Sequence, residues 1–220
     1  MFNVKNVIKH FINSLRAAKS EFYKQKKYKT ITKINKLVID SLLNSQSPIR
    51  LELGASNQRI KGWLAVDLME TSDICLNLLC PLPFPDNSVT EIYSSHLLEH
   101  FYYPDLINLL SECHRILKSG GRFSAAVPNA RIYVEAYFNP EQFDANAYCV
   151  YKPGFNYNSK IDYVNYIAYM GGHHRFMFDE ENLLIILNKA GFRDARLREF
   201  NPGLDLEERK NESIYAEGVK

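Results

Sequence analysis

The sequence has no apolar run that approaches the roughly 18–20 residues needed to cross a bilayer. Its N-terminus lacks an unbroken apolar stretch followed by a small-residue cleavage site, so we expect no secretion signal. The four cysteines form no C-x-x-C pair and no disulfide-rich spacing, and reduced thiols in a cytoplasmic protein are the simplest interpretation. The 220 residues are 46% hydrophobic and 13% aromatic, which is enough for one globular domain with a short extension.

The positive charge is concentrated in the N-terminal part of the chain. Residues 1–50 contain eleven Lys or Arg and only two acidic residues, so their net charge is +9 against −7 for the rest. Apolar residues at helical spacing predict an amphipathic helix over 3–22 and a second helix over 31–44. The basic segment could lie peripherally on an anionic membrane or cover an apolar patch of its own domain. Its run KQKKYK lacks a pattern of stacking aromatics, so we expect no nucleic-acid partner.

A change of pattern at NSQSP, residues 44–48, separates a basic helical extension, 1–47, from a main domain, 48–220. In the main domain short apolar runs alternate with turns and helices. Strands are predicted at 49–53, 63–67, 73–77, 89–95, 122–128, 194–200 and the C-terminal end. One helix is predicted to start near Pro104 and to end at Gly120 and Gly121, and another covers 179–190. This alternation predicts an α/β fold, a doubly wound Rossmann-like sandwich with a mostly parallel sheet.

In such a sheet, ligands bind beyond the carboxyl ends of the strands. Gly54 permits a tight turn there, Asp67 could accept hydrogen bonds from two ribose hydroxyls, and Asn77 with Leu78 could hold an adenine. The residues that end the first four strands therefore predict a nucleoside site: Glu52, Gly54, Ala55, Ser56, Asp67, Leu68, Asn77, Leu78 and Ser95.

Two nucleoside cofactors fit these strand ends. A dinucleotide site needs G-x-G-x-x-G at the start of a full helix, which holds the pyrophosphate. This chain offers one glycine and then nine residues, Ala55 to Trp63, before the core of the next strand. S-adenosylmethionine has no phosphates, and its sulfonium tolerates a nearby carboxylate such as Glu52. The sequence therefore favours S-adenosylmethionine.

Three stretches resemble the class I S-adenosylmethionine-dependent methyltransferases: LELGASNQRIKGWLAVDL, PLPFPDNSVTEIYSSHLLEH and LLSECHRILKSGGRFSAAVPN. More narrowly, they resemble the small bacterial predicted methyltransferases with a G-C-G-like loop and an H-x-L-E-H segment. HHRFMFDEENLLIILNKAGF and ESIYAEGVK are similar to that family's C-terminal helix and last strand. The resemblance covers residues 49–220 and implies a seven-stranded sheet with an antiparallel last strand, methyl transfer as the activity and S-adenosyl-L-methionine as the cofactor. It also places Glu52, Gly54, Asp67, Asn77 and Leu78 at cofactor-binding positions.

One departure from the family's loop leaves an alternative open. The loop usually reads Gly-Cys-Gly, whereas this chain has Gly54-Ala55-Ser56, which adds a Cβ where the cofactor's tail approaches. A non-catalytic protein that binds or has lost the cofactor, and serves as a partner module, is therefore the alternative function.

The string HLLEH, residues 96–100, also has the H-x-x-E-H spacing of an inverted zinc peptidase. A zinc hydrolase using His96, Glu99 and His100 is the second alternative. It would need both imidazoles on a stable helix, and Pro104 limits that helix to about two turns. We therefore expect no metal ligands and take His96 and His100 as candidate catalytic residues, because a neutral histidine can accept a proton from a hydroxyl acceptor.

Residues 131–178 form a long, tyrosine-rich connection. Such a segment is typical of a lid over a substrate or, alternatively, of a small satellite core. Tyr133, His173, His174 and Arg175 are the candidate substrate-binding residues, and Arg175 would favour an anionic acceptor. The sequence thus predicts methyl transfer to a small acceptor, sugar-derived or anionic, in the cytoplasm or peripherally at the inner membrane surface, and it indicates no oligomeric state.

Overall fold

A computed structural model describes residues 26, 29–55 and 60–220, in two compact units, Met1–Ser45 and Gln46–Lys220. Residues 29–44 are helical, close to the helix predicted over 31–44, whereas the helix predicted over 3–22 lies outside the described residues. Within the described ranges no helix is both long enough and apolar enough to cross a membrane. A peripheral contact of the basic segment with a membrane remains a prediction.

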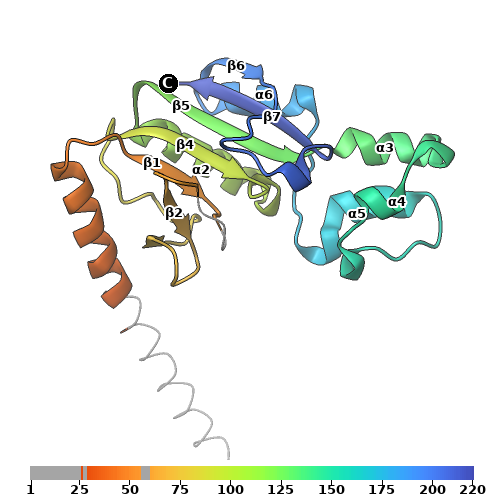
Figure 1. Cartoon of the computed structure of the whole chain (residues 1–220), viewed down its shortest axis with the longest axis horizontal. Helices are drawn as coiled ribbons and strands as arrows, with labels where there is room; N and C mark the ends of the chain where they lie inside the picture. The colour runs from red at the N-terminus through yellow and green to blue at the C-terminus, as the bar shows by residue number, and fades with distance from the viewer. Residues whose placement is uncertain (1–25, 27–28, 56–59) are drawn as a thin grey trace, which may run out of the picture. The chain divides into compact units, whose positions relative to one another are not determined.

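The second unit is built on a seven-stranded sheet with the strand order β3-β2-β1-β4-β5-β7-β6 (Figure 1). Its strands are β1 (Arg50–Leu53), β2 (Leu64–Asp67), β3 (Ile74–Cys75), β4 (Val89–Ser95), β5 (Leu117–Pro128), β6 (Arg193–Leu197) and β7 (Ser213–Val219). Strands β1 to β5 are parallel, and β7 runs antiparallel to β5 and to β6. The order and directions confirm the predicted Rossmann-like sheet with an antiparallel last strand.

Two amphipathic helices bury their apolar residues under this sheet. They are α2 (Tyr103–Ile116), which lies behind the strands in Figure 1, and α6 (Glu180–Lys189). Leu106 and Leu110 of α2 and Leu187 of α6 are fully buried. The central strands are largely buried, β1 over residues 51–53 and β4 at residue 89 and over residues 92–94.

The junction of α2 and β5 differs from the prediction. The sequence suggests that Gly120 and Gly121 end the helix, but α2 ends at Ile116 and β5 begins at Leu117. Gly120 has a φ of +76°, and a Cβ at Gly121 would lie 2.8 Å from the carbonyl oxygen of Lys118. The two glycines therefore form an irregularity within the strand instead of a helix cap.

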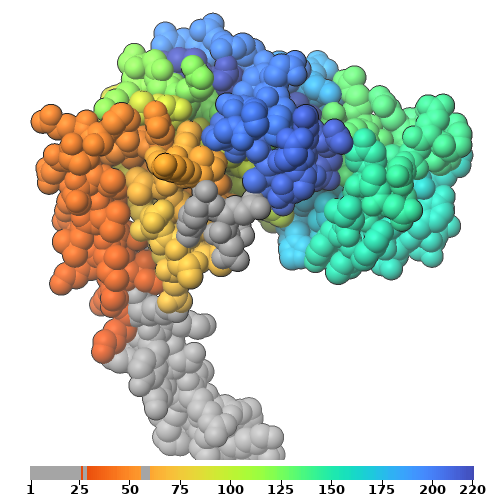
Figure 2. Space-filling model, in the orientation of Figure 1, coloured from red at the N-terminus to blue at the C-terminus, as the bar shows by residue number. Residues whose placement is uncertain are grey.

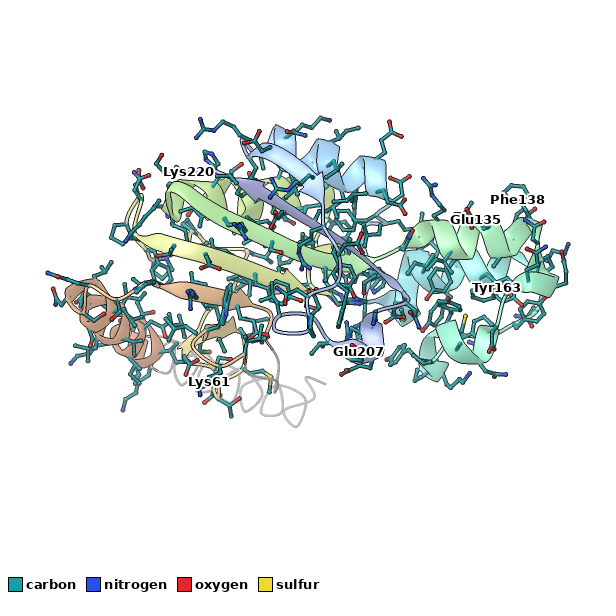
Figure 3. The ribbon with its side chains drawn as sticks, turned by 45° about the horizontal axis from the view of Figure 1, so that its top comes forward. Lys61, Glu135, Phe138, Tyr163, Glu207 and Lys220 are labelled. Atoms are coloured by element: carbon teal, nitrogen blue, oxygen red, sulfur yellow. The ribbon has the colours of Figure 1, made fainter. Side chains whose placement is uncertain are left out.

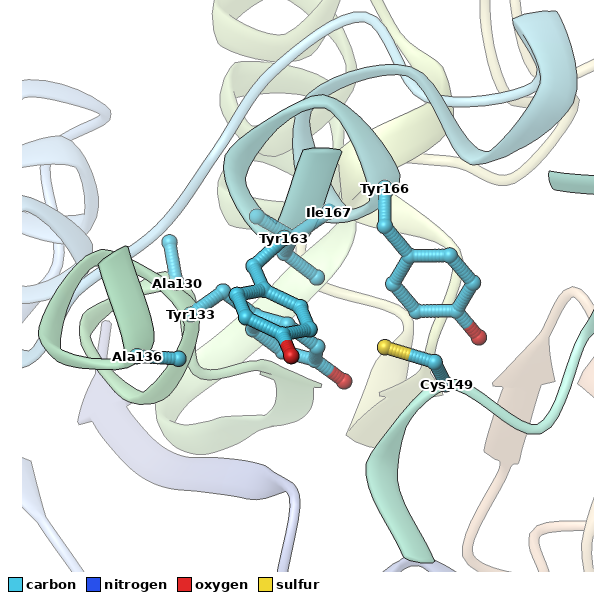
Figure 4. Close-up of a cluster of buried hydrophobic side chains, with 7 residues drawn as sticks. All are labelled: Ala130, Tyr133, Ala136, Cys149, Tyr163, Tyr166 and Ile167. Atoms are coloured by element: carbon cyan, nitrogen blue, oxygen red, sulfur yellow. The ribbon is translucent and has the colours of Figure 1, made fainter. Parts of the chain in front are cut away.

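Residues 130–172 form a small helical subdomain beyond the end of β5, which makes up the green-to-teal side of the space-filling view (Figure 2). Its elements are α3 (Ala130–Phe138), η2 (Pro140–Gln142), α4 (Ala145–Tyr148), η3 (Lys152–Gly154), α5 (Ile161–Tyr169) and η4 (Met170–Gly172). Tyr133, Tyr163 and Tyr166 pack around Cys149 and Ile167 (Figure 4). This part of the chain thus has a satellite core.

The connection between β6 and β7 is held against the sheet by a buried ion pair. The guanidinium of Arg198 donates to both carboxylate oxygens of Asp205, at 2.6 and 2.7 Å. The Tyr93 hydroxyl, from β4, donates to the same carboxylate at 2.9 Å. This network fixes the start of the segment that leads to η5 (Glu207–Arg209), whose Glu207 lies at the end of the sheet beside the helical subdomain (Figure 3).

We expect Arg198→Met to lower the free energy of unfolding by about 3 kcal/mol, because it leaves the buried Asp205 carboxylate without its counter-charge. The matched control is Arg50→Met. The side chains of Arg50 and its partner Glu91 are 42% and 34% exposed, so losing this pair should cost less than about 1 kcal/mol. Urea denaturation of the three proteins measures both values, and equal losses would contradict the structural role of the buried pair.

Candidate functional site

The turn after β1 depends on a glycine. Gly54 has a φ of +70°, and its amide donates to the carbonyl of Val66 at 2.9 Å. A Cβ at this position would lie 2.8 Å from Cδ1 of Leu97. Only glycine therefore lets the backbone turn here while Leu97 closes over it.

Beyond this turn lies the first cavity, of about 340 Å³. Its walls are mostly apolar, and its polar side chains come from strand ends and from η1 (Leu98–His100). The residues that define it are Gly54, Asp67, Leu68, Leu76, Asn77, Leu78, Leu79, Leu97, His100, Phe101, Tyr102 and Asp105. The size and the apolar lining with a few polar groups are those of a small-molecule site.

The polar groups of the first cavity suit a nucleoside. Asp67 accepts a hydrogen bond from the Met69 amide at 3.1 Å, which orients its carboxylate at the end of β2. The side-chain oxygen of Asn77 accepts from the Leu79 amide at 3.0 Å. A carboxylate for a ribose diol thus lies next to an apolar slot that could hold a base.

Five of the nine predicted cofactor residues line the first cavity: Gly54, Asp67, Leu68, Asn77 and Leu78. The other four do not line it. Glu52 is buried and accepts from the Ile60 amide at 3.3 Å, and Ala55 is buried as well. Ser95 does not line this cavity, and Ser56 lies outside the described residues. The sequence reasoning missed Leu97, Phe101 and Tyr102. The signal for Phe101 and Tyr102 was an aromatic pair directly after the HLLEH string, and Leu97 lies within that string, close to a strand end.

A second cavity, of about 520 Å³, adjoins the first. It is defined by His96, Glu99, His100, Val150, Tyr151, Tyr166, Met170, His173, His174, Glu208, Arg209 and Glu212. These residues come from the end of β4, the helical subdomain and the segment around η5. His100 lines both cavities, so its side chain belongs to the walls of the two.

His96 is held in one tautomer. The Ser213 hydroxyl donates its single hydrogen to the Arg209 carbonyl at 2.8 Å, so it accepts from Nε2 of His96 at 2.7 Å. The other nitrogen, Nδ1, therefore has a free lone pair and lies 3.9 Å from Oε1 of Glu99. Burial lowers the pKa of His96 well below its usual value, which keeps the imidazole neutral.

Glu99 is a buried carboxyl group at the centre of the site, with only 2% of its side chain exposed. Burial raises the pKa of Glu99 to about 8. Its Oε2 atom accepts no hydrogen bond from the described residues. Its backbone carbonyl accepts from the amides of Arg175 and Phe176, at 2.8 and 3.2 Å, which attaches the HHRF segment to η1.

His100 and His174 each use Nδ1 to donate to a backbone carbonyl. The acceptor for His100 is the His173 carbonyl at 3.0 Å, and the acceptor for His174 is the Ile167 carbonyl at 2.7 Å. The two rings lie nearly perpendicular, with centroids 5.3 Å apart. Burial lowers the pKa of His174 to about 4. Both imidazoles therefore leave Nε2 with a lone pair.

The zinc-peptidase arrangement considered from the sequence does not form. His96 lies before η1 with a φ of +47°, and η1 is a single 3₁₀ turn, so no α-helix carries both histidines of the string. Two predicted substrate residues also lie away from the cavities. Tyr133 is in the satellite core, where its hydroxyl donates to the Tyr148 carbonyl, and the exposed Arg175 donates to the Gly172 and His174 carbonyls.

Comparison with known proteins agrees with this reading of the sheet and the first cavity. Residues 53–125, from the end of β1 to β5, match the family model described as a methyltransferase domain. The matched span contains all of the residues that define the first cavity. This match identifies residues 53–125 as a methyltransferase domain and, together with the first cavity, supports methyl transfer from S-adenosylmethionine as the activity.

Solved structures with a similar fold share little sequence with this methyltransferase. An S-adenosylmethionine-dependent methyltransferase of Archaeoglobus fulgidus is 16% identical, covers 84% of this chain and 94% of its own, and has a TM-score of 0.47. One of Mesorhizobium loti is 16% identical, covers 81% and 95%, and has a TM-score of 0.46. The phosphoethanolamine N-methyltransferase 2 of Haemonchus contortus, solved with S-adenosyl-L-methionine, is 15% identical, covers 84% and 52%, and has a TM-score of 0.46. No curated protein matches the sequence.

We expect Asp67→Asn to weaken S-adenosylmethionine binding about tenfold, because the amide offers one acceptor oxygen to the ribose diol where the carboxylate offers two. The remaining oxygen still accepts from the Met69 amide, so the fold should be preserved. Calorimetric titration measures the dissociation constant. Asp194→Asn, on β6 and remote from the first cavity, is the matched control, and an unchanged affinity in Asp67→Asn would remove Asp67 from the cofactor site.

Proposed function

We propose that this methyltransferase methylates a hydroxyl group of a small, sugar-derived acceptor that binds in the second cavity. The observation that carries the proposal is that His100 lines both cavities. An acceptor in the second cavity and a cofactor in the first would therefore both lie beside the His100 side chain. Methyl transfer requires alignment of the two reacting atoms and exclusion of water, which adjoining pockets can supply.

In this proposal the first cavity holds the cofactor by its nucleoside. Asp67 accepts hydrogen bonds from the ribose hydroxyls, and Leu68 and Leu78 pack against the adenine. Gly54 lets the backbone approach without a Cβ. Bound S-adenosylmethionine supplies a methyl group on a sulfonium, which leaves as a neutral thioether.

The lining of the second cavity supports a sugar-derived acceptor. Tyr151 is 40% exposed and offers a ring face, which suits the C–H face of a sugar ring. Its amide donates to the Tyr166 hydroxyl at 3.1 Å, which ties it to the satellite core. Glu208, Arg209 and Glu212 offer charged hydrogen-bonding groups for sugar hydroxyls. Arg209, and not the predicted Arg175, is the cation that an anionic substituent of the acceptor would meet.

His96 is the proposed base. Its Nε2–H donates to Ser213, so Nδ1 carries the lone pair inside the cavity. An acceptor hydroxyl beside Nδ1 could give up its proton as the new O–CH₃ bond forms. The hydrogen bond to Ser213 fixes the ring orientation that this role needs.

Isotope-labelled S-adenosylmethionine tests the proposal directly. The enzyme is incubated with methyl-labelled cofactor and matched panels of neutral sugars, nucleotide sugars and anionic sugars, and products are identified by mass spectrometry. We expect label on an oxygen of at least one sugar derivative. Transfer only to amine or thiol acceptors would contradict the proposal, and a preference for the anionic panel that Arg209→Met abolishes would define the acceptor further.

We expect His96→Asn to lower kcat about 100-fold and to leave the affinity for S-adenosylmethionine unchanged, because only proton acceptance is lost. Asparagine tolerates the positive φ of this position, so the backbone strain is small. His114→Asn, on α2 and away from both cavities, is the matched control with unchanged kcat. Full activity of His96→Asn would exclude His96 as the base.

A further inference from the structure

We propose that Glu99, His100 and His174 bind a divalent transition-metal ion, for which Zn²⁺ is the best fit. One ligand atom from each of the three lies within 4.8 Å of the others. Two imidazoles and one carboxylate form a donor set that zinc sites use. The sequence predicts no metal ligands, and His174 is far from the HLLEH string in the sequence, so only the fold brings it to Glu99.

The two imidazoles are already oriented as metal ligands are. Each donates Nδ1–H to a backbone carbonyl, His100 to His173 and His174 to Ile167. Histidines that bind metals nearly always donate their second nitrogen in this way, which fixes the tautomer and the ring direction. The free Nε2 of His100 lies 3.9 Å from Oε1 of Glu99.

The carboxylate of Glu99 is the second observation that indicates a ligand. The side chain is 2% exposed, and Oε2 has no hydrogen-bond partner among the described residues. A buried carboxylate oxygen without a partner is costly, and native structures rarely contain one without a cause. A bound cation would satisfy it.

The donor atoms are spaced so that small movements would complete the site. Ligands of a tetrahedral zinc ion lie about 3.3 Å apart, given Zn–N and Zn–O distances near 2.0–2.1 Å. The three donors of this site, within 4.8 Å of one another, would need to approach by up to roughly 1.5 Å. Three protein ligands leave a position open, as in catalytic zinc sites. All three residues line the second cavity, so an oxygen of its contents could take that position.

The role of the ion rests on the proposed function. A zinc-bound hydroxyl is more acidic than a free one, so the acceptor could lose its proton near neutral pH. The proton passes to Nδ1 of His96, which lies 3.9 Å from Glu99 and outside the three-donor group. The acceptor oxygen then uses its lone pair to form the O–CH₃ bond, and the electron pair of the C–S bond stays on sulfur.

Zinc binding itself can be measured without cofactor or acceptor. The full chain is stripped with a chelator and titrated with Zn²⁺ by equilibrium dialysis and elemental analysis. We expect about one saturable ion per chain. X-ray absorption of the zinc-loaded wild-type protein should show two imidazoles and oxygen donors at about 2.0–2.1 Å, and this readout needs no variant.

Three substitutions test the ligands. Glu99→Gln, His100→Asn and His174→Asn should each weaken zinc binding by more than about 100-fold, since even outer-shell partners contribute 10–100-fold. The control His114→Asn removes a histidine of α2 whose ring packs on Phe192, and it should bind zinc as the wild type does. Circular dichroism identifies any variant that fails to fold. For such a residue, the X-ray absorption spectrum of the wild-type protein decides whether imidazoles bind the ion.

Each outcome separates the metal site from the proposed function. Absence of saturable binding, a spectrum without imidazole scattering, or an equal loss in His114→Asn would overturn the site, while methylation of a sugar hydroxyl could still be observed. If the ion binds as expected but no hydroxyl acceptor is methylated, the metal site stands and the proposed acceptor chemistry fails. Equal methylation rates in the zinc-loaded and the chelator-stripped enzyme would leave the metal site standing but would exclude a role of the ion in methyl transfer.

Discussion

The two hydrogen bonds to the backbone carbonyl of Glu99 are the constraint on which the site depends. The amides of Arg175 and Phe176 donate to it, and so they join η1, at the end of β4, to a segment that is more than 70 residues later in the chain. This junction brings His174 against His100 and sets the helical subdomain beside the strand ends. Both the shape of the second cavity and the three-donor group follow from it.

The remaining wall of the second cavity depends on a different interaction. The buried Arg198–Asp205 pair, with Tyr93 as a further donor, holds the start of the segment that carries Glu208, Arg209 and Glu212. Both charges are almost fully desolvated, so the pair stabilises this conformation more through its geometry than through net Coulomb energy. Ser213, at the start of β7, then fixes His96. The Arg198–Asp205 network on the face of the sheet thus determines the orientation of the His96 ring at the carboxyl ends of the strands.

The sheet could be predicted from local patterns, whereas half of the site could not. Apolar runs and turns located β1, β2 and β3, and the residues at or just after their ends gave Gly54, Asp67 and Asn77, because the carboxyl ends of parallel strands meet at one edge. Arg209 and the neighbours of His174 depend on contacts between distant segments, for which a single sequence has no signal. Gly120 and Gly121 were misassigned because glycine marks both a helix end and a strand irregularity.

The HLLEH string shows how backbone conformation decides the chemistry of a motif. On an α-helix, His96 and His100 would lie one turn apart on one face and could share an ion. Here the positive φ of His96 turns its ring toward Ser213, and the short η1 turn presents Glu99 and His100 together. His96 is thereby separated from the three-donor group and keeps a lone pair that can accept a proton. The fold brings His174 to Glu99 and His100 in its place. The same five residues thus divide between proton acceptance and ligation, which is the division that an acid–base methyl transfer at a metal-bound hydroxyl would need.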